Sequence, residues 1–159
     1  MTKHTDEFFV YSAQRTISME ADAVSALSST LGPPFAAACR HILGTNGRVV
    51  VTGMGKSGHI AGKIAATLAS TGTPAFFVHP GEASHGDMGM ITASDCVIAL
   101  SNSGNTHELL TLLPLIKRLG IPLISMTGSD TSELAQAADV HLLASVETEA
   151  CPLNLAPTS

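Results

Sequence analysis

A glycine-rich loop that carries a lysine follows the first strongly apolar run of the chain. In VVVTGMGKSGHIAGKIAA, Gly53, Gly55 and Gly58 allow a tight turn with exposed backbone N–H groups, and the helix expected after Ser57 adds the positive end of its dipole. Together these features predict an anion site suited to phosphate. Lys56 supports this interpretation, because desolvating a lysine without a partner is costly. A plain tight turn before a helix is the alternative.

The same loop matches two nucleotide-binding motifs only in part. It fits G-x-G-x-x-G, but the acidic residue expected at the end of the next strand is replaced by His79-Pro80-Gly81. It is not a P-loop, because Val50 stands where the first glycine of that motif is required. A dinucleotide-binding oxidoreductase therefore remains only as an alternative, and it leaves the second polar loop without a role.

That second loop follows another buried run, in VIALSNSGNTHELL. Its short polar side chains can hydrogen-bond phosphate oxygens without adding bulk or charge, and they are Ser101, Asn102, Ser103 and Thr106. A helix cap needs only one hydroxyl, so this number of them favours a ligand over ordinary capping. Glu108 falls in the first turn of the following helix, where a carboxylate either complements the helix dipole or serves as a base.

Two further segments carry groups that could take part in chemistry. FFVHPGEASHGDMGMI holds four polar side chains that could bind a metal, shuttle protons or hold sugar hydroxyls, namely His79, Glu82, His85 and Asp87. Their spacing matches no established metal-ligand pattern, and solvated loop residues are the alternative. Glu147 and Glu149 precede a Cys-Pro turn in VETEACPLNLAPTS, where acidic residues are either solvated or catalytic.

Short apolar runs that alternate with helical stretches must position these loops. We predict strands at 49–51, 75–78, 96–100, 122–126 and 140–143, and helices at about 5–30, 35–43, 57–71, 105–119 and 132–138. This alternation is typical of a parallel sheet covered on both faces. We therefore expect one domain over 1–159, a doubly wound α/β fold of about five strands with N-terminal helices over 1–45. The two polar loops then share the carboxyl edge of the sheet.

The composition narrows the class of protein. The 159 residues carry a formal net charge of −5, with 45% hydrophobic and 13% charged residues, which is typical of one soluble domain with a real core. No basic run indicates a nucleic-acid or anionic-membrane surface, and no apolar stretch approaches the roughly 18 residues of a membrane span. Three cysteines without a C-x-x-C pair fit no disulfide or zinc framework, so we expect a reducing compartment, the cytoplasm.

Taken together, the motifs resemble the SIS (sugar isomerase) domain, and more narrowly the arabinose-5-phosphate isomerase family. GMGKSGHI, ASTGTP, FFVHPGEA, SNSG, EACPL and LAPTS stand in the family's order from about residue 48 to 159. The resemblance implies catalytic roles for Lys56, Glu108 and Glu149. It implies sugar-phosphate contacts from Ser57, Gly72, Thr73, His85, Ser101, Asn102, Ser103 and Thr106. It places His79 at a position associated with zinc, which the family's chemistry does not require.

The resemblance also implies a function. Members of this family interconvert D-ribulose 5-phosphate and D-arabinose 5-phosphate through a cis-enediolate, for Kdo synthesis in lipopolysaccharide or capsule, and the resemblance implies a homotetramer that needs no cofactor. Glu149 would move the proton between C1 and C2, with Glu108 as the competing candidate, and Lys56 would stabilise the enediolate or hold the phosphate. A sugar-phosphate sensor without turnover is the alternative. Family members commonly continue with further helices, a catalytic histidine and paired CBS domains, and we expect this chain to lack those parts.

Overall fold

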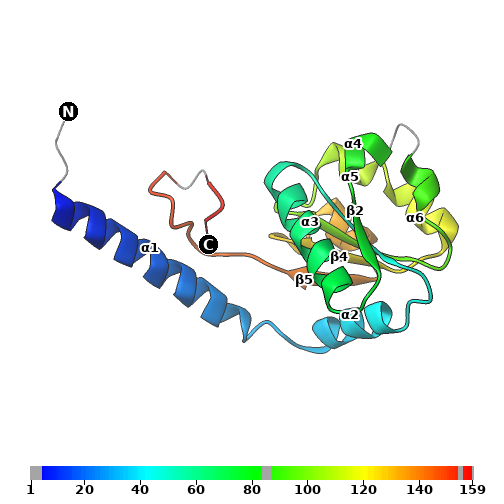
Figure 1. Ribbon diagram of the computed structural model, residues 1–159, viewed down its shortest axis with the longest axis horizontal. Coiled ribbons are helices and arrows are strands. Elements are labelled where there is room, and N and C mark those ends of the chain that lie inside the picture. Colours follow the sequence, from blue (N-terminus) through cyan, green and yellow to red (C-terminus); the bar gives the residue numbers. More distant parts are fainter. Residues whose placement is uncertain (1–4, 84–86, 154–155, 159) are drawn as a thin grey trace. The chain divides into compact units, whose positions relative to one another are not determined.

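The computed structural model describes residues 5–83, 87–153 and 156–158 (Figure 1). The chain divides into two compact units, Met1–Leu31 with Val146–Ser159, and Gly32–Ser145. The unit Gly32–Ser145 contains the sheet and both polar loops. Helix α1 and the segment that carries Glu149 belong to the other unit.

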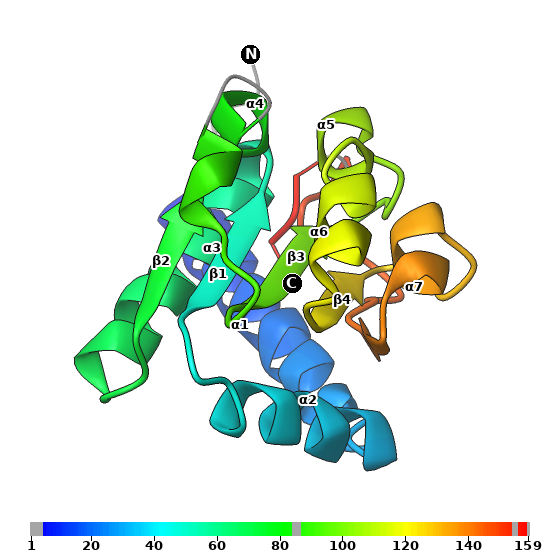
Figure 2. The same ribbon diagram turned by 90° about the vertical axis from the view of Figure 1, so that its right-hand side faces the viewer.

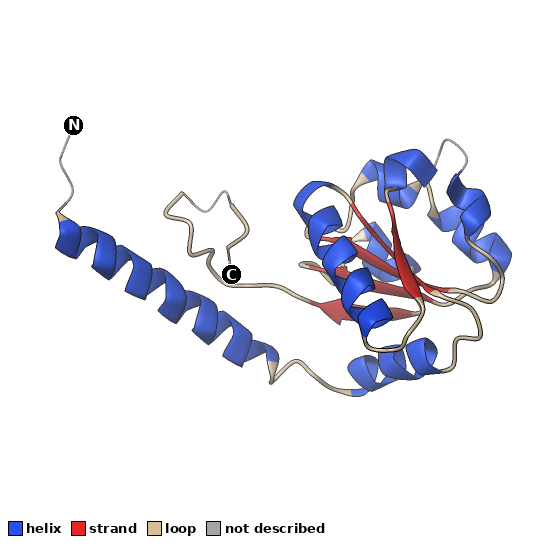
Figure 3. Cartoon of the chain, in the orientation of Figure 1, coloured by secondary structure: helices blue, strands red, loops and turns tan. Residues whose placement is uncertain are grey.

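Within the described residues, five parallel strands form one sheet in the order β2-β1-β3-β4-β5. Figure 3 draws the strands of this sheet in red. The strands are β1 (Val49–Gly53), β2 (Ala75–Val78), β3 (Cys96–Ser101), β4 (Leu123–Thr127) and β5 (Val140–Leu143). β1 and β3 are buried at every position, as expected of apolar strands in a sheet covered on both faces. The predicted α/β fold with a five-stranded parallel sheet is confirmed.

Helices cover the two faces of this sheet (Figure 2). α2 (Pro33–Leu43) and α3 (Gly55–Ser70) pack small side chains against one face, namely Ala38, Ala61 and Ala65. α5 (His107–Leu110), α6 (Leu113–Leu119) and α7 (Glu133–Ala137) cover the opposite face with Leu109, Ile116 and Leu134, and Leu112 packs there from the link between α5 and α6. The helix that follows β1 therefore covers one face of the sheet, and the helices that follow β3 cover the other. In doubly wound sheets, the crevice at the carboxyl ends of two such neighbouring strands is the usual ligand site.

The single helix predicted over 105–119 is wrong, because the structure breaks it into α5 and α6. Pro114 lies in the first turn of α6 and has no N–H to donate to the preceding turn. At the end of α5, Thr111 Oγ1 donates a hydrogen bond to the carbonyl of Glu108 at 2.7 Å. α5 is consequently only four residues long, and Glu108 lies within it.

The polar segment between β2 and β3 forms two short helical turns, α4 (Pro80–Ala83) and η1 (Asp87–Met90). Its far end is fixed by the buried carboxylate of Asp95, which accepts from the backbone N–H groups of Arg48 and Thr92, each at 2.7 Å. The Arg48 guanidinium lies 3.6 Å from Asp95, donates to the carbonyl of Met90 at 2.6 Å, and lies 4.4 Å from the ring centre of Phe76. Burial opposes ionisation, but these hydrogen bonds and the Arg48 charge hold the pKa of Asp95 below its ordinary 3.8.

In the other unit, α1 (Asp6–Leu27) begins at Thr5, whose hydroxyl accepts from the N–H of Phe8 at 3.3 Å. α1 buries none of its residues. Three of its β-branched side chains are spaced by seven residues and are 58 to 67% exposed, namely Val10, Ile17 and Val24. Among the described residues, no helix is both long and apolar enough to cross a membrane.

Candidate functional site

The glycine-rich loop joins β1 to α3 through direct backbone contact. A Cβ on Gly58 would lie 2.6 Å from the carbonyl oxygen of Gly53, and one on Gly53 would lie 2.9 Å from that of Ser57. Gly55 has a φ of +54°, which side-chain-bearing residues rarely adopt. These glycines bring the first turn of α3 to the carboxyl edge of the sheet.

The N-terminus of α3 lies at that edge without a side-chain cap. Met54 stands at the N-cap position and makes no side-chain hydrogen bond to the helix. Lys56 is exposed in the first turn and Ser57 is half-buried beside it. A 16-residue helix whose first turn has no side-chain cap, with an adjacent ammonium group, offers an anion both N–H donors and positive charge.

The serine loop, residues 101–106, follows β3 and is held by its own hydroxyls. Ser101 Oγ lies 2.8 Å from Thr106 Oγ1 and accepts from the N–H of Gly104 at 3.0 Å. Ser103 Oγ accepts from the N–H of Asn105 at 3.2 Å. The Ser101–Thr106 pair uses one hydroxyl hydrogen internally and leaves the other, and Ser103 keeps its own, so the loop still has donors for a phosphate.

Asn102 and Glu108 complete this part of the site. Asn102 is exposed, and its backbone carbonyl accepts from the N–H of Gly128 at 2.9 Å. Glu108 is exposed in the first turn of α5. The structure thus brings Lys56, Ser57 and the serine loop to one edge of the sheet, in the loops that follow the neighbouring strands β1 and β3.

Gly72 and Thr73 lie at the opposite edge. They follow the C-terminus of α3 and precede β2, where Gly72 has a φ of +98° and the N–H of Thr73 donates to the carbonyl of Leu68 at 2.9 Å. The five residues of β1 separate the two edges by roughly 16 Å. Within one copy of the chain, these two residues are therefore remote from the serine loop.

Of the two predicted histidines, His79 and His85, the structure describes only His79. His79 Nδ1 accepts from the N–H of Gly81 at 3.2 Å, and the centre of its ring lies 6.4 Å from that of Phe77 in an edge-to-face arrangement. His85 lies outside the described residues. No group of three or more His, Cys, Asp or Glu side chains suited to a metal ion occurs in the part of the chain that the structure describes. Zinc binding at His79 therefore stays a prediction.

Glu149 organises the segment in which it lies. Its Oε2 accepts from the N–H of Thr158 at 2.6 Å and from the Thr158 hydroxyl at 3.2 Å. That hydroxyl in turn accepts from the N–H of Cys151 at 3.0 Å. The half-buried carboxylate therefore ties the EACPL and LAPTS motifs to each other within their own unit.

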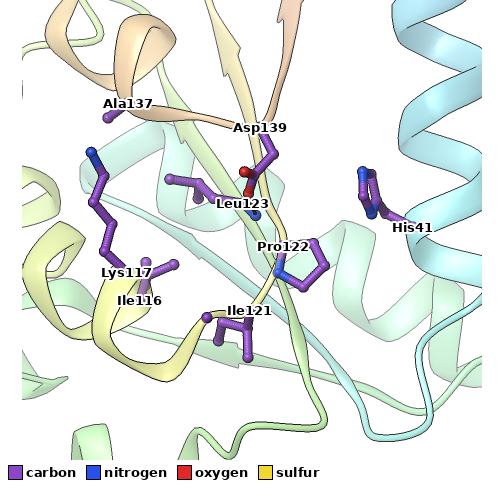
Figure 4. Close-up of a pocket in the computed structure, with 9 residues that line it drawn as sticks. His41, Ile116, Lys117, Ile121, Pro122, Leu123, Ala137 and Asp139 are labelled. Carbon is purple, nitrogen blue, oxygen red and sulfur yellow. Dashed lines mark hydrogen bonds between the residues drawn. The ribbon is translucent and has the colours of Figure 1, made fainter.

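A cavity of about 510 Å³ lies away from these loops, at the edge of the sheet where the strands begin (Figure 4). Its lining is mostly apolar and includes His41, Ile116, Lys117, Gly120, Ile121, Pro122, Leu123, Ala137 and Asp139. The Asp139 carboxylate already accepts from the N–H of Leu123 at 2.8 Å. The cavity shares no residue with the predicted phosphate site.

The comparison with protein families decides the class of this site. The model of the SIS domain matches residues 42–159, which is most of the chain and includes both polar loops. The chain belongs to the SIS domain family.

Curated relatives of this SIS chain carry one recurrent name. The arabinose 5-phosphate isomerase KdsD of Pseudomonas aeruginosa is 70% identical over 151 residues, which cover 95% of this chain and 46% of the relative. The protein of the same name from Escherichia coli strain K12 is 53% identical over the same share of each chain. The chain thus spans about half the length of the curated relatives it matches.

Solved structures agree with the SIS fold. The E. coli CFT073 protein c3406, solved in complex with arabinose 5-phosphate, superposes with a TM-score of 0.92 at 43% identity, covering 97% of this chain and 82% of that one. A protein from Bacteroides fragilis described as a putative phosphosugar isomerase involved in capsule formation gives 0.87 at 36% identity, covering 94% and 80%.

One part of this SIS site was not predicted from the sequence. The β4 loop, residues 127–132, follows β4 and lies against the serine loop, where the N–H of Gly128 donates to the carbonyl of Asn102 at 2.9 Å. The start of α7 (Glu133–Ala137) adds two more bonds, of which one runs from the N–H of Leu134 to the carbonyl of Gly104 at 3.0 Å. The N–H of Glu133 donates to Asn105 Oδ1 at 2.9 Å. The sequence does carry a signal, TGSDTS after a buried strand, which has the same small polar composition as the serine loop.

Proposed function

We propose that this chain carries the phosphosugar site of an isomerase that interconverts D-ribulose 5-phosphate and D-arabinose 5-phosphate. The observation that carries the proposal is that the N-terminus of α3, which has no side-chain cap, and the serine loop follow neighbouring strands at the same edge of the sheet. Relatives up to 70% identical that are named arabinose 5-phosphate isomerase support this choice of substrate.

The phosphate end of the substrate would bind first-turn N–H groups of α3 together with the remaining hydroxyl hydrogens of the serine loop. Ser57, Ser101, Ser103 and Thr106 supply short donors, and Asn102 supplies an amide. Neither loop contributes an acid at the positions that would face the phosphate. Binding energy from this remote group can then orient the carbon atoms that react.

At the other end of the substrate, isomerisation moves one proton between C1 and C2 through a cis-enediolate. A carboxylate takes the proton from one carbon and returns it to the other, while a cation or donors stabilise the developing oxyanion. Glu149 is the base in this proposal and Glu108 is the competing candidate. Lys56 stabilises the enediolate or holds the phosphate.

We further propose that the chain acts as a homo-oligomer, a tetramer as the family resemblance implies. The exposed β-branched side chains at seven-residue spacing on α1 are of the kind that pack between helices. Gly72 and Thr73 give a second argument. If they contact the same sugar phosphate as the serine loop, a neighbouring copy must supply them, because they lie at the other edge of the sheet.

In this proposal the product serves Kdo synthesis, for lipopolysaccharide or capsule, in the cytoplasm. The partner is a small phosphosugar, without nucleic acid, membrane or an obligatory cofactor. The acidic net charge of −5 agrees with the absence of a polyanion-binding surface.

The proposal is tested by incubating the chain with D-arabinose 5-phosphate and following the sugar phosphates by ³¹P NMR. D-ribose 5-phosphate and D-glucose 6-phosphate serve as controls. The proposal predicts a ribulose 5-phosphate signal from the arabinose substrate. Line broadening by the substrate without any conversion would favour the sensor function instead.

A further inference from the structure

The serine loop does not hold its shape alone, because the β4 loop and the start of α7 support it from one side. The N–H of Gly128 donates to the carbonyl of Asn102, that of Leu134 to the carbonyl of Gly104, and that of Glu133 to Asn105 Oδ1, at 2.9 to 3.0 Å. These three hydrogen bonds connect the loop that follows β3 with the loop that follows β4 and with the start of α7.

Ser132 lies between the β4 loop and α7 and is 3% exposed. Its hydroxyl donates to the carbonyl of Ser129 at 2.8 Å, lies 3.4 Å from Thr127 Oγ1, and accepts from the N–H of Ala135 at 3.4 Å. The side chain therefore fixes the β4 loop and the N-terminus of α7 with the same atom.

The same side chain also limits the conformation of the serine loop. Gly104 has a φ of +66°, and a Cβ built on it would overlap Ser132 Oγ and Cβ and lie 3.2 Å from Thr127. The middle of the serine loop thus packs directly against Ser132. A shift of the Ser132 side chain would move Gly104, and with it the orientation of the flanking hydroxyls.

We infer that Ser132, assisted by Asn105, is a positioning residue for phosphate binding, and that it acts through the serine loop without touching the ligand; this inference rests on the proposed function. Its hydroxyl is occupied by three neighbours within the protein, so it has no hydrogen left for an anion. Its contribution is to keep the donors of the serine loop in one arrangement before phosphate binds, which lowers the cost of ordering the loop.

The test measures the affinity of the chain for inorganic phosphate and the kinetics with D-arabinose 5-phosphate. The variants are Ser132→Ala, which deletes the hydroxyl, and Asn105→Ala, which deletes the exposed acceptor for Glu133. Ser132→Thr keeps the hydroxyl. Ser125→Ala is the matched control, because it removes a fully buried serine hydroxyl from β4, the strand before the β4 loop, and that hydroxyl lies 3.0 Å from His141 Nδ1.

Ser132→Ala and Asn105→Ala should each weaken phosphate binding roughly fivefold, the effect of about one hydrogen bond, and raise KM by a similar factor with kcat within twofold. Ser132→Thr and Ser125→Ala should keep both values within twofold of the wild type, even where Ser125→Ala lowers Tm. If Ser132→Ala does not fold, Asn105→Ala decides the question.

Unchanged phosphate affinity in Ser132→Ala, or in Asn105→Ala where Ser132→Ala does not fold, would overturn the role of Ser132 while leaving the proposed function intact. An equal loss in Ser125→Ala would overturn it too, since the effect would then come from general destabilisation. A wild-type chain that binds no phosphate at all would contradict the proposed function itself, and the inference with it.

Discussion

The two glutamates compete for the role of base, and their surroundings differ. Glu108 is exposed at the start of a helix, next to the serine loop, whereas Glu149 is half-buried and accepts two hydrogen bonds from Thr158. A carboxylate held by fixed donors is oriented, while an exposed one at a helix start also has a purely structural use. Glu149 stays our proposed candidate for the group that moves the proton.

We predict that Glu149→Gln lowers kcat for arabinose 5-phosphate at least 100-fold with KM little changed, because the amide cannot accept the proton. Glu108→Gln should lower kcat by less than tenfold. Steady-state assays of both variants check this, with the exposed Glu133→Gln as control. Near-normal turnover of Glu149→Gln beside an inactive Glu108→Gln would reverse the assignment.

Asp95 should make the stability of the fold depend on acid. Its pKa is below 3.8 in the folded chain, so the carboxylate contributes stability that is present above the unfolded value and is lost as pH falls through the folded value. We expect Asp95→Asn to cost about 1–3 kcal/mol at pH 7 and to show a smaller further loss between neutral pH and pH 3. Urea unfolding across this pH range measures both effects.

The exposed Asp130 provides the control for this experiment. Asp130→Asn should leave the free energy of unfolding within about 0.5 kcal/mol at either pH, as is usual for surface substitutions. If Asp95→Asn retained the full acid sensitivity of the wild type, the acid sensitivity would come from other groups.

The approach of α3 to β1 depends on two small residues. Gly58→Ala places a Cβ 2.6 Å from the carbonyl of Gly53, so the helix must move away from the strand. We expect a loss of about 1–3 kcal/mol in stability, together with weaker phosphate binding, because the first turn of α3 is displaced. Thermal unfolding and phosphate titration measure the two effects.

Gly62 supplies the matched control in the same helix, since a Cβ there meets no atom within 4 Å. Gly62→Ala should be neutral or stabilise by up to about 1 kcal/mol, because alanine favours the helix. Equal destabilisation by the two substitutions would mean that the contact with Gly53 is not what limits residue 58.

The sequence predicts the elements that neighbouring residues determine, whereas contacts between distant segments cannot be predicted from it. The run Val49–Val51 and the alternation of strands and helices predict the sheet, because burial on both faces requires continuous apolar strands. The break before Pro114 was missed, although the proline that causes it is visible in the sequence. The hydrogen bond between Gly104 and Leu134 could not be predicted, because it joins the serine loop to α7, and the proximity of these two segments follows only from the strand order.

The candidate site also combines features that the sequence predicts with one that it does not. The chemistry of Lys56 and the serine loop could be predicted from residue types, and the parallel sheet explains why they share an edge. The position of Gly72 and Thr73 at the opposite edge follows from the direction of α3, which starts at the carboxyl edge and ends just before these two residues. The role of Ser132 depends on one buried contact with no sequence motif of its own.

We expect α1 to determine the oligomeric state of the chain. We predict that Ile17→Asp lowers the mass of the particle in solution to that of a smaller oligomer or monomer, because a charge replaces an apolar side chain that is 66% exposed in one copy. Light scattering coupled to gel filtration measures the mass. Ala26→Asp, which introduces the same charge at an exposed position on the opposite side of the helix, should leave the mass unchanged, and an unaltered mass of Ile17→Asp would remove α1 from the interface.

The most direct test of the proposed isomerase is proton exchange during turnover. The chain is mixed with D-arabinose 5-phosphate in D₂O, and ¹H NMR follows both the appearance of ribulose 5-phosphate and the deuterium that enters at the exchanging carbon. A cis-enediolate mechanism with one carboxylate predicts conversion accompanied by deuterium at C2 of the aldose and C1 of the ketose. Phosphate-dependent binding with neither conversion nor exchange would contradict it, and would leave the chain as a phosphosugar-binding SIS domain.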